Sequence, residues 1–308
     1  MRILIVASYN KGCFAPFILE QAGALKVKEC EIDFFGLQGR GWKGYMKNLS
    51  ILKQRIKAFR PDVIHAHYGL SGLFANLQRM VPVVTTYHGS DINEPKVLPL
   101  SRVAMRLSAW NVFVDTKTLD IAQPKRDFTL LPCGIDLSDL QLTEKSEARQ
   151  KLGLEKGKRY ILFAGAFDNQ VKNVPLAKEA VSWLKDDRVE LLELKGYSRE
   201  EVTLLMCAAD AFLMTSFSEG SPQVVKEALA SGCPIVSVDV GDVRERTKGV
   251  EGCFVTDSRH PQDLAELLQK ALLFEGKTHG REKVIADKLD NESVAQQLIG
   301  IYNNVLKK

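Results

Sequence analysis

The chain has 308 residues, 45% hydrophobic and 26% charged, which is an ordinary soluble composition with enough apolar material for two domains. Its net charge of +4 is too small to predict nucleic-acid binding, and no apolar run reaches the roughly 18 residues of a membrane span. The six cysteines are dispersed without a Cys-x-x-Cys pair, which argues against a disulfide framework or a zinc site. The opening "MRILIVASYN" lacks the length of a signal peptide, so we expect a cytoplasmic protein.

Short apolar runs alternate with amphipathic segments along the whole chain. In the first half, strands are expected at Ile3–Ala7, Cys30–Phe35, Val63–Ala66, Val83–Tyr87, Val112–Val114 and Phe128–Leu131. In the second half, they are expected at Tyr160–Ala164, Val189–Leu194, Ala211–Met214, Ile235–Val238 and Cys253–Val255. Strands that are apolar on both faces, separated by helical periodicity, predict an α/β fold with parallel sheets covered by helices.

A polar, charged stretch at 137–159 interrupts this alternation and holds no long apolar run. It indicates the passage between two domains. We therefore expect a first domain over 1–140, a linker region over 141–159 and a second domain over 160–290. An amphipathic helix at Glu292–Leu306 lies in the remaining segment, 291–308, and is a candidate to pack back toward the first domain.

The segment "TSFSEGSPQVVKEALASGCPIVSVD", Thr215–Asp239, carries the strongest local signals. Ser221 is a suitable N-cap, Pro222 fits the first helical position, and Gly232 fits the residue after a helix end. These signals predict a helix over Pro222–Ser231.

A helix start offers unpaired N–H groups and partial positive charge, which favour a phosphate, and Gly220 lets the backbone approach closely. Glu219 precedes the predicted helix and Glu227 lies inside it. One carboxylate could then face a transferred sugar while the other takes ribose hydroxyls. Spacing alone also fits a capped amphipathic helix with one loop glutamate and one exposed glutamate.

The same segment, "EGSPQVVKEALASGCPIV", resembles the Glu-x7-Glu motif of retaining glycosyltransferase family 4. Weaker matches to that family follow its order at Asp62–Gly69, Tyr87–Asp91, Leu131–Asp136 and Gly241–Glu245. The resemblance implies the GT-B fold, in which two Rossmann-like domains with parallel sheets face each other across a cleft. In that fold the donor nucleotide is held mainly by the second domain.

The resemblance assigns catalytic roles to His88, Glu219 and Lys172. It implies that His88 lies near the hydroxyls of the donor sugar and that Glu219 contacts the sugar near the reacting centre. Lys172 would neutralise the diphosphate, where charge builds on the leaving group. The arginine that the family places in this stretch is Ala166 here, which removes one cation from the diphosphate site.

Further positions are implied to bind the donor or line the cleft. Glu227 corresponds to the residue that holds the ribose. The other donor-binding candidates are Gly12, Gly196, Gly220, Ser221 and Pro222. His67 and Asp91 are candidates for the acceptor side of the cleft, whereas His65 is expected to pack inside.

The expected activity is that of a hexosyltransferase-type, retaining glycosyltransferase, with a nucleotide-sugar as co-substrate and UDP as the default nucleotide. The acceptor would be a glycan or a lipid-linked acceptor in polysaccharide, glycan or glycolipid biosynthesis. No Asp-x-Asp pair occurs, so no metal cofactor is expected, and the absence of Gly-x-Gly-x-x-Gly weakens a nicotinamide oxidoreductase reading. The alternatives are a non-catalytic sugar-nucleotide binder, a nucleotide-sugar 2-epimerase and a phosphorylase.

The segment 40–60 is basic and lacks acids. Its seven cations are Arg40, Lys43, Lys47, Lys53, Arg55, Lys57 and Arg60, with Trp42 and Tyr45 near its start. Leu49, Leu52, Ile56 and Phe59 form one helical stripe, which predicts that the helix packs inward with its charges outward. The charges form either a solvated face or a patch for anionic lipid headgroups at the inner face of a membrane. Acceptor specificity is expected in loops at Gln38–Lys47 and Asp91–Ser101.

Overall fold

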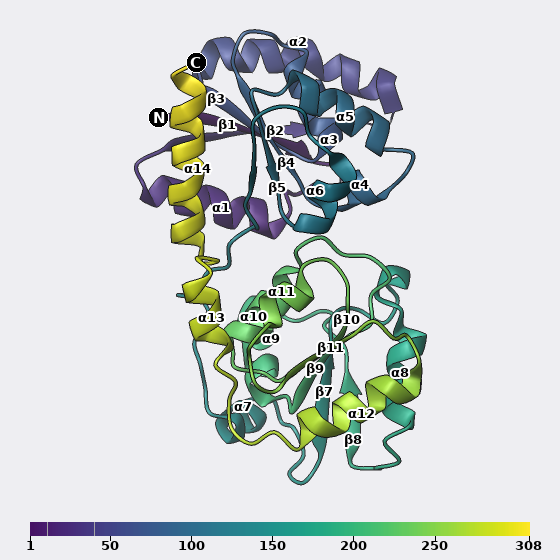
Figure 1. The fold of residues 1–308 in the computed structure, drawn as a ribbon. Coiled ribbons are helices and arrows are strands. Elements are labelled where there is room, and N and C mark those ends of the chain that lie inside the picture. The colour runs from purple at the N-terminus through teal and green to yellow at the C-terminus, as the bar shows by residue number, and fades with distance from the viewer. Residues whose placement is uncertain (11, 40) are drawn as a thin grey trace. The chain divides into compact units, whose positions relative to one another are not determined.

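The structure is a computed structural model that describes residues 1–10, 12–39 and 41–308, with only the backbone of 41–46. It divides into two compact units, each with its own sheet and core (Figure 1). The first unit comprises Met1–Gly134 together with Asn291–Lys308, and the second comprises Ile135–Asp290. The chain therefore passes between the units twice.

The first unit is built on a six-stranded parallel sheet in the order β2-β1-β3-β4-β5-β6. Its strands are β1 (Arg2–Ser8), β2 (Glu31–Leu37), β3 (Val63–His67), β4 (Val83–Tyr87), β5 (Trp110–Phe113) and β6 (Phe128–Leu130). Alternate residues of β1 serve two different cores: Ile3 and Ile5 pack with α1 (Pro16–Val27), and Leu4 and Val6 pack with α2 (Gly41–Phe59). A strand that is apolar on both faces is thereby covered by helices on both sides.

The other helices of the first unit follow the strands in the usual alternation. They are α3 (Gly69–Asn76), α4 (Ser90–Asn93), α5 (Leu98–Leu107) and α6 (Thr116–Ala122). Two segments expected as acceptor loops are partly helical, because α2 begins at Gly41 and α4 and α5 occupy most of 91–101. Leu52 and Ile56 of α2 are buried against the sheet, as the stripe predicts. Arg40 and the side chains of Trp42, Lys43 and Tyr45 lie outside the described residues.

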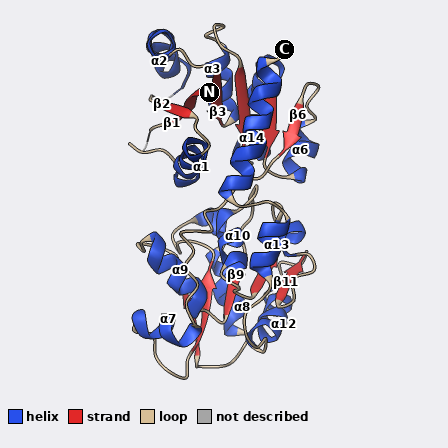
Figure 2. Ribbon diagram, turned by 90° about the vertical axis from the view of Figure 1, so that its left-hand side faces the viewer, coloured by secondary structure: helices blue, strands red, loops and turns tan. Residues whose placement is uncertain are grey.

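The C-terminal helix α14 (Asn291–Leu306) belongs to the first unit, where it lies beside α1 (Figure 2). Its apolar side chains complete the core on the α1 face of the sheet. Those fully or nearly buried are Val294, Ala295, Leu298, Ile301, Tyr302 and Val305. The first 134 residues thus lack part of their own core, and the end of the chain supplies it.

The second unit has a five-stranded parallel sheet in the order β11-β10-β9-β7-β8. Its strands are β7 (Arg159–Phe163), β8 (Val189–Leu192), β9 (Ala211–Met214), β10 (Ile235–Val238) and β11 (Cys253–Thr256). Its helices are α7 (Lys145–Lys151), η1 (Gln170–Lys172), α8 (Val174–Ser182), α9 (Arg199–Ala208), α10 (Gln223–Ala230), α11 (Val243–Thr247), α12 (Pro261–Leu272) and α13 (Gly280–Ala286). Sequential βα units explain why every strand pairing is parallel.

The region expected as a linker, 141–159, belongs to the second unit instead. Its helix α7 buries Ala148 against Cys207 and Ala208 of α9. Arg149 extends from α7 and forms an ion pair with Asp210 at 2.6 Å. A short helix that buries one small side chain between charged residues gives almost no hydrophobic periodicity. The prediction of a linker over 141–159 was wrong for this reason. Within the described ranges, no helix is both long and apolar enough to cross a membrane.

Candidate functional site

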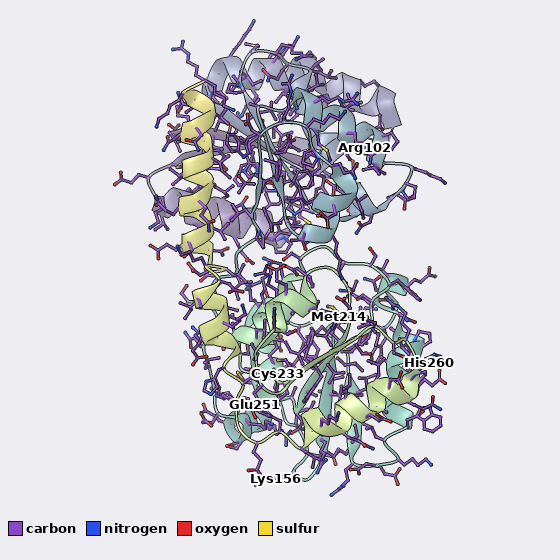
Figure 3. The ribbon with its side chains drawn as sticks, viewed as in Figure 1. Arg102, Lys156, Met214, Cys233, Glu251 and His260 are labelled. Atoms are coloured by element: carbon purple, nitrogen blue, oxygen red, sulfur yellow. The ribbon has the colours of Figure 1, made fainter. Side chains whose placement is uncertain are left out.

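The loops that follow β7 and β9 meet at the carboxyl edge of the second unit's sheet, because these two strands are neighbours. Figure 3 labels Met214, the last residue of β9, where one of these loops begins. The Phe217 N–H donates to the Val171 carbonyl at 2.9 Å, and the Thr215 hydroxyl donates to the Lys172 carbonyl at 2.9 Å. These bonds hold the loop before α10 against η1.

Lys172 and Glu219, predicted separately as catalytic residues, form an ion pair across these two loops. The Lys172 Nζ lies 2.7 Å from the Glu219 Oε1, and the two side chains are only 16% and 17% exposed. Gly165 leaves the space for the lysine stem, since a Cβ there would lie 3.1 Å from its side-chain carbons. The described structure therefore brings the predicted diphosphate cation and the predicted sugar-contacting acid together.

The start of α10 differs from the prediction. The helix begins at Gln223, Pro222 is the N-cap residue with extended backbone, and no side chain caps the helix. Ser221 is not the cap, because its hydroxyl donates instead to the Asp242 Oδ2 at 2.7 Å. That bond joins the loop before α10 to the loop before α11, and local sequence patterns do not predict this contact.

Gly220 and Gly241 touch through their backbones at the same edge. A Cβ on Gly241, whose φ is +56°, would lie 1.9 Å from the Gly220 carbonyl oxygen. The Asp242 N–H donates to that same oxygen at 3.0 Å, and the Arg246 Nε donates to the Asp242 Oδ2 at 3.1 Å. The Gly220 peptide is thus fixed from the next loop.

Glu227 lies on α10 and pairs with Arg199 at the start of α9, at a distance of 3.2 Å. Its side chain is 13% exposed, and burial raises its pKa against the opposing effects of Arg199 and Lys226. Lys226 itself is completely buried. The two glutamates of the motif therefore have different cationic partners, and sequence analysis did not single out Arg199.

In the first unit, three imidazoles form a column at the carboxyl ends of β3 and β4. The His67 Nδ1 is 3.1 Å from the His88 Nε2, and the His65 and His67 rings stack with centroids 4.4 Å apart. The column continues at both ends. The His88 Nδ1 faces the Cys133 Sγ at 3.7 Å, and the Tyr302 hydroxyl of α14 lies 2.6 Å from the His65 Nδ1.

His67 and Asp91, expected to face a cleft, are buried in the first unit. Burial lowers the pKa of His67 well below its ordinary value, and the neighbouring His65 and His88 lower it further. The Asp91 carboxylate accepts the N–H groups of Gly69, His88 and Gly89 at 2.8, 3.0 and 3.1 Å. Burial raises the pKa of Asp91 to about 6 against these hydrogen bonds. Asp91 thus positions the His88 loop from within.

The remaining glycine candidates lie in turns with positive φ. Gly12 follows β1 with φ +75°, and its N–H donates to the Tyr9 carbonyl at 3.0 Å. Gly196 has φ +80° and lies two residues before Ser198, the N-cap of α9. No atom lies within 4 Å of a Cβ built on either glycine. The described residues contain no group of three or more His, Cys, Asp or Glu that could hold a metal ion.

Comparison with known families matches both units of this chain. A family model described as Glycosyltransferase Family 4 matches residues 21–139, and one described as Glycosyl transferases group 1 matches residues 178–273. These two matches support a family 4 glycosyltransferase. Its two parallel-sheet α/β domains are of the GT-B class.

Similar proteins are also named as glycosyltransferases. The putative teichuronic acid biosynthesis glycosyltransferase TuaC of Bacillus subtilis is 30% identical over 63% of this chain and 57% of its own length. A D-inositol 3-phosphate glycosyltransferase of Mycolicibacterium gilvum is 26% identical over 72% of this chain and 61% of its own length. This chain thus spans less than two thirds of these relatives. Anabaena HepE in complex with UDP has a TM-score of 0.77 and 16% identity, covering 99% of this chain and 100% of that one.

Ala166 occupies the position at which the resemblance to family 4 implies an arginine. The Ala166 carbonyl accepts the Asn169 N–H at 3.2 Å, in the turn that leads to η1. Arg259, which sequence analysis missed, donates to the carbonyls of Thr215 and Ser216 at 3.3 and 2.9 Å. A second cation therefore lies beside the loop before α10, bound to its backbone.

Proposed function

We propose that this chain is a glycosyltransferase that moves a sugar from a nucleotide-sugar to an acceptor hydroxyl, with retention at the anomeric carbon. The observation that carries the proposal is the ion pair between Lys172 and Glu219 beside the uncapped start of α10. A partly buried lysine–glutamate pair at the carboxyl edge of a parallel sheet fits a site for an anionic ligand. Retention is proposed from the resemblance to family 4.

The pair would change partners when the donor binds. In the free chain Glu219 neutralises Lys172 at 2.7 Å. A donor diphosphate would take over the lysine, and Glu219 would then be available to hydroxyls of the sugar. The start of α10, the Gly220 peptide and the Ser221 and Pro222 backbone would contribute dipoles that favour the diphosphate.

In the reaction, the bond from the anomeric carbon to the diphosphate oxygen breaks and a bond to the acceptor oxygen forms. The acceptor hydroxyl gives its proton to the released nucleoside diphosphate, which neutralises the negative charge that forms on that leaving group. Lys172 would stabilise that growing negative charge in a site of restricted solvent access. We propose that no metal ion shares this task, since the chain lacks an Asp-x-Asp pair.

Two other predicted residues would hold the rest of the donor. Glu227, kept in place by Arg199, would accept the ribose hydroxyls. His88 would contact the sugar through its Nδ1. This nitrogen makes only a long contact of 3.7 Å with the Cys133 Sγ, whereas the Nε2 lies 3.1 Å from His67. The His67 contact would fix the ring plane of His88, so that only one ring nitrogen is offered to the sugar.

UDP is the proposed nucleotide, supported by the structural likeness to HepE, whose structure contains UDP. We propose a glycan or lipid-linked acceptor, in keeping with the polymer named for TuaC. The exposed cations of α2, such as Lys47 and Lys57, would hold the protein at an anionic membrane surface. Flotation with anionic and neutral vesicles tests this last point, and equal recovery with both would refute it.

Donor turnover with UDP-, GDP- and ADP-sugars tests the function. Replacing Lys172 or Glu219 by alanine is expected to lower donor turnover about 100-fold or more, because each removes a preorganised charge. Lys195→Ala is the matched control, since Lys195 forms an exposed ion pair with Asp168 in neighbouring loops. The proposal fails if Lys172→Ala and Glu219→Ala turn over donor as fast as Lys195→Ala.

A further inference from the structure

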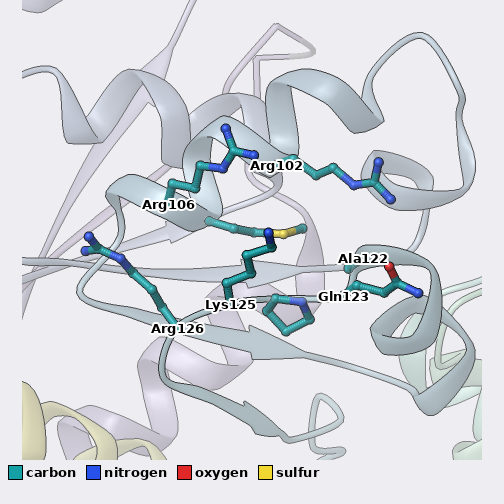
Figure 4. Close-up of a pocket in the computed structure, with 8 residues that line it drawn as sticks. Arg102, Arg106, Ala122, Gln123, Lys125 and Arg126 are labelled. Atoms are coloured by element: carbon teal, nitrogen blue, oxygen red, sulfur yellow. The ribbon is translucent and has the colours of Figure 1, made fainter.

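A cationic pocket lies in the first unit, away from the residues discussed above. It is formed by the second half of α5, the end of α6 and the loop that enters β6, and its volume is about 200 Å³. Its lining includes the cations Arg102, Arg106, Lys125 and Arg126, which Figure 4 labels, together with Met105 and Ala122. The C-terminal ends of α5 and α6 precede β5 and β6, so the pocket lies at the sheet edge opposite the His88 loop.

The charges of this pocket are largely uncompensated. Arg102 donates to the Ile121 carbonyl at 3.0 Å and thereby binds the end of α6. No carboxylate lines the pocket, and within the described ranges Arg106, Lys125 and Arg126 form no ion pair. The nearest acid in sequence, Asp127, is paired with Lys308.

Helix ends account for only part of this charge. A cation near a helix C-terminus offsets the partial negative charge of the last carbonyls. Arg106 in the last turn of α5 and Arg102 at the end of α6 fill that role. Lys125 and Arg126 lie beyond the end of α6, so neither is needed to offset the partial charge of that helix end.

The geometry points to a binding site for a phosphate-bearing group. The planar guanidinium of an arginine can donate hydrogen bonds to two oxygens of a phosphate at once, and a lysine ammonium adds a positive charge. The cavity of about 200 Å³ is smaller than the roughly 300–1,000 Å³ of sites that enclose drug-sized ligands. It therefore fits a phosphate, a diphosphate or a lipid headgroup phosphate rather than a whole nucleotide-sugar. This site is separate from the transfer reaction proposed above.

Titration calorimetry with inorganic phosphate and with pyrophosphate at low salt tests the pocket. The variant Arg106→Gln/Lys125→Gln removes two pocket cations, and Lys125→Gln/Arg126→Gln confines the change to the loop. The control Lys248→Gln/Lys270→Gln makes the same charge change at two exposed lysines of the second unit. We expect both pocket variants to bind about tenfold more weakly and the control to stay within about twofold of the unmodified chain, with all affinities falling as salt rises.

Flotation with phosphatidylglycerol vesicles, compared with phosphatidylcholine vesicles, identifies the source of the phosphate. If the pocket variants lose only the binding of soluble phosphate, the ligand of the pocket is a free phosphate. If the pocket variants lose binding to the anionic vesicles, the ligand of the pocket is a lipid headgroup. Equal behaviour of pocket variants and control in both assays, or no binding by the unmodified chain in either, overturns the site whatever the outcome for donor turnover.

Discussion

At the scale of single residues, Gly241 is the tightest point of the candidate site. A Cβ there would lie 1.9 Å from the Gly220 oxygen, whereas one on Gly249, with φ +78°, would meet nothing within 4 Å. Both glycines have positive φ, so Gly249→Ala measures the backbone strain alone, about 1 kcal/mol. Gly241→Ala should cost at least about 2 kcal/mol more, because the Gly220 peptide must move.

Urea unfolding of the two variants gives this difference directly. Gly241→Ala should also weaken donor binding, since the Gly220 peptide is proposed to face the diphosphate, while Gly249→Ala should not. Equal unfolding free energies for the two variants would contradict the close packing of the two glycines.

Asp91 gives a pH dependence whose sign is unusual for a carboxyl. Burial raises its pKa to about 6 in the folded chain, above the ordinary value of 3.8. The folded state therefore holds a proton that the unfolded state has lost between about pH 4 and 6, so stability falls as pH rises through this range. The difference corresponds to about 3 kcal/mol.

Asp91→Asn removes this titration and keeps one oxygen for the N–H groups of His88 and Gly89, while its NH2 group replaces the oxygen that accepts the Gly69 N–H. Chemical unfolding at intervals from pH 4 to 7 should show the unmodified chain losing about 2–3 kcal/mol relative to the variant. Parallel curves for the two proteins would mean that Asp91 stays ionised throughout.

At the scale of elements, α14 matters because one of its side chains enters the polar interior of the first unit. The Tyr302 hydroxyl lies 2.6 Å from the His65 Nδ1, and the His65 Nε2 lies 2.7 Å from the Thr86 Oγ1. Burial lowers the pKa of His65 to about 3, so the ring is neutral and needs both partners. Tyr302→Phe should cost about 1–3 kcal/mol, because it leaves a buried nitrogen unpaired.

Urea unfolding measures that cost, and Tyr197→Phe is the control because Tyr197 is 43% exposed. The change is small in volume, so a loss confined to Tyr302→Phe isolates the hydrogen bond. A loss of the same size in Tyr197→Phe would show that the hydroxyl of Tyr302 contributes nothing specific.

Elements with strong periodicity could be placed from sequence, and contacts between elements could not. The ranges Val83–Tyr87, Ala211–Met214 and Ile235–Val238 were predicted as strands with the bounds that β4, β9 and β10 have. Apolar runs flanked by turn residues give such strands clear limits. The start of α10 was misjudged because Ser221 has a better partner in Asp242, 21 positions along the chain. Local capping signals cannot report a bond that the sheet order creates.

The candidate site shows the same division. Sequence identified Lys172 and Glu219 as residues of interest, but their ion pair spans 47 positions and depends on β7 lying beside β9. Arg199 and Arg259 gave no signal, because a lone arginine in a loop or at a helix start is common on protein surfaces. The motif around Asp91 predicted that its side chain lines the cleft. The structure shows instead that Asp91 is buried and accepts a hydrogen bond from the His88 backbone.

At the scale of the whole molecule, the two units have separate cores and the chain passes between them at 134–135 and 290–291. A ligand that binds only one unit should therefore stabilise that unit first. Lys172, Glu219 and Glu227, which are proposed to hold the donor, all belong to the second unit, Ile135–Asp290. UDP lacks the sugar that His88 would contact, so its effect should be confined mainly to the second unit.

Hydrogen exchange measured by mass spectrometry separates the two units. With UDP at about 100 times its dissociation constant, a site on the folded state adds about 2.7 kcal/mol of stability. Exchange should slow most in 165–173 and 215–227, the loops that hold Lys172 and Glu219, and β1 to β6 should change little. Lys172→Ala should lose this protection while Lys195→Ala keeps it, since both remove one positive charge but only Lys172 forms the ion pair with Glu219. Protection centred on the first unit would place the nucleotide elsewhere and remove the basis for the proposed roles of Lys172, Glu219 and Glu227.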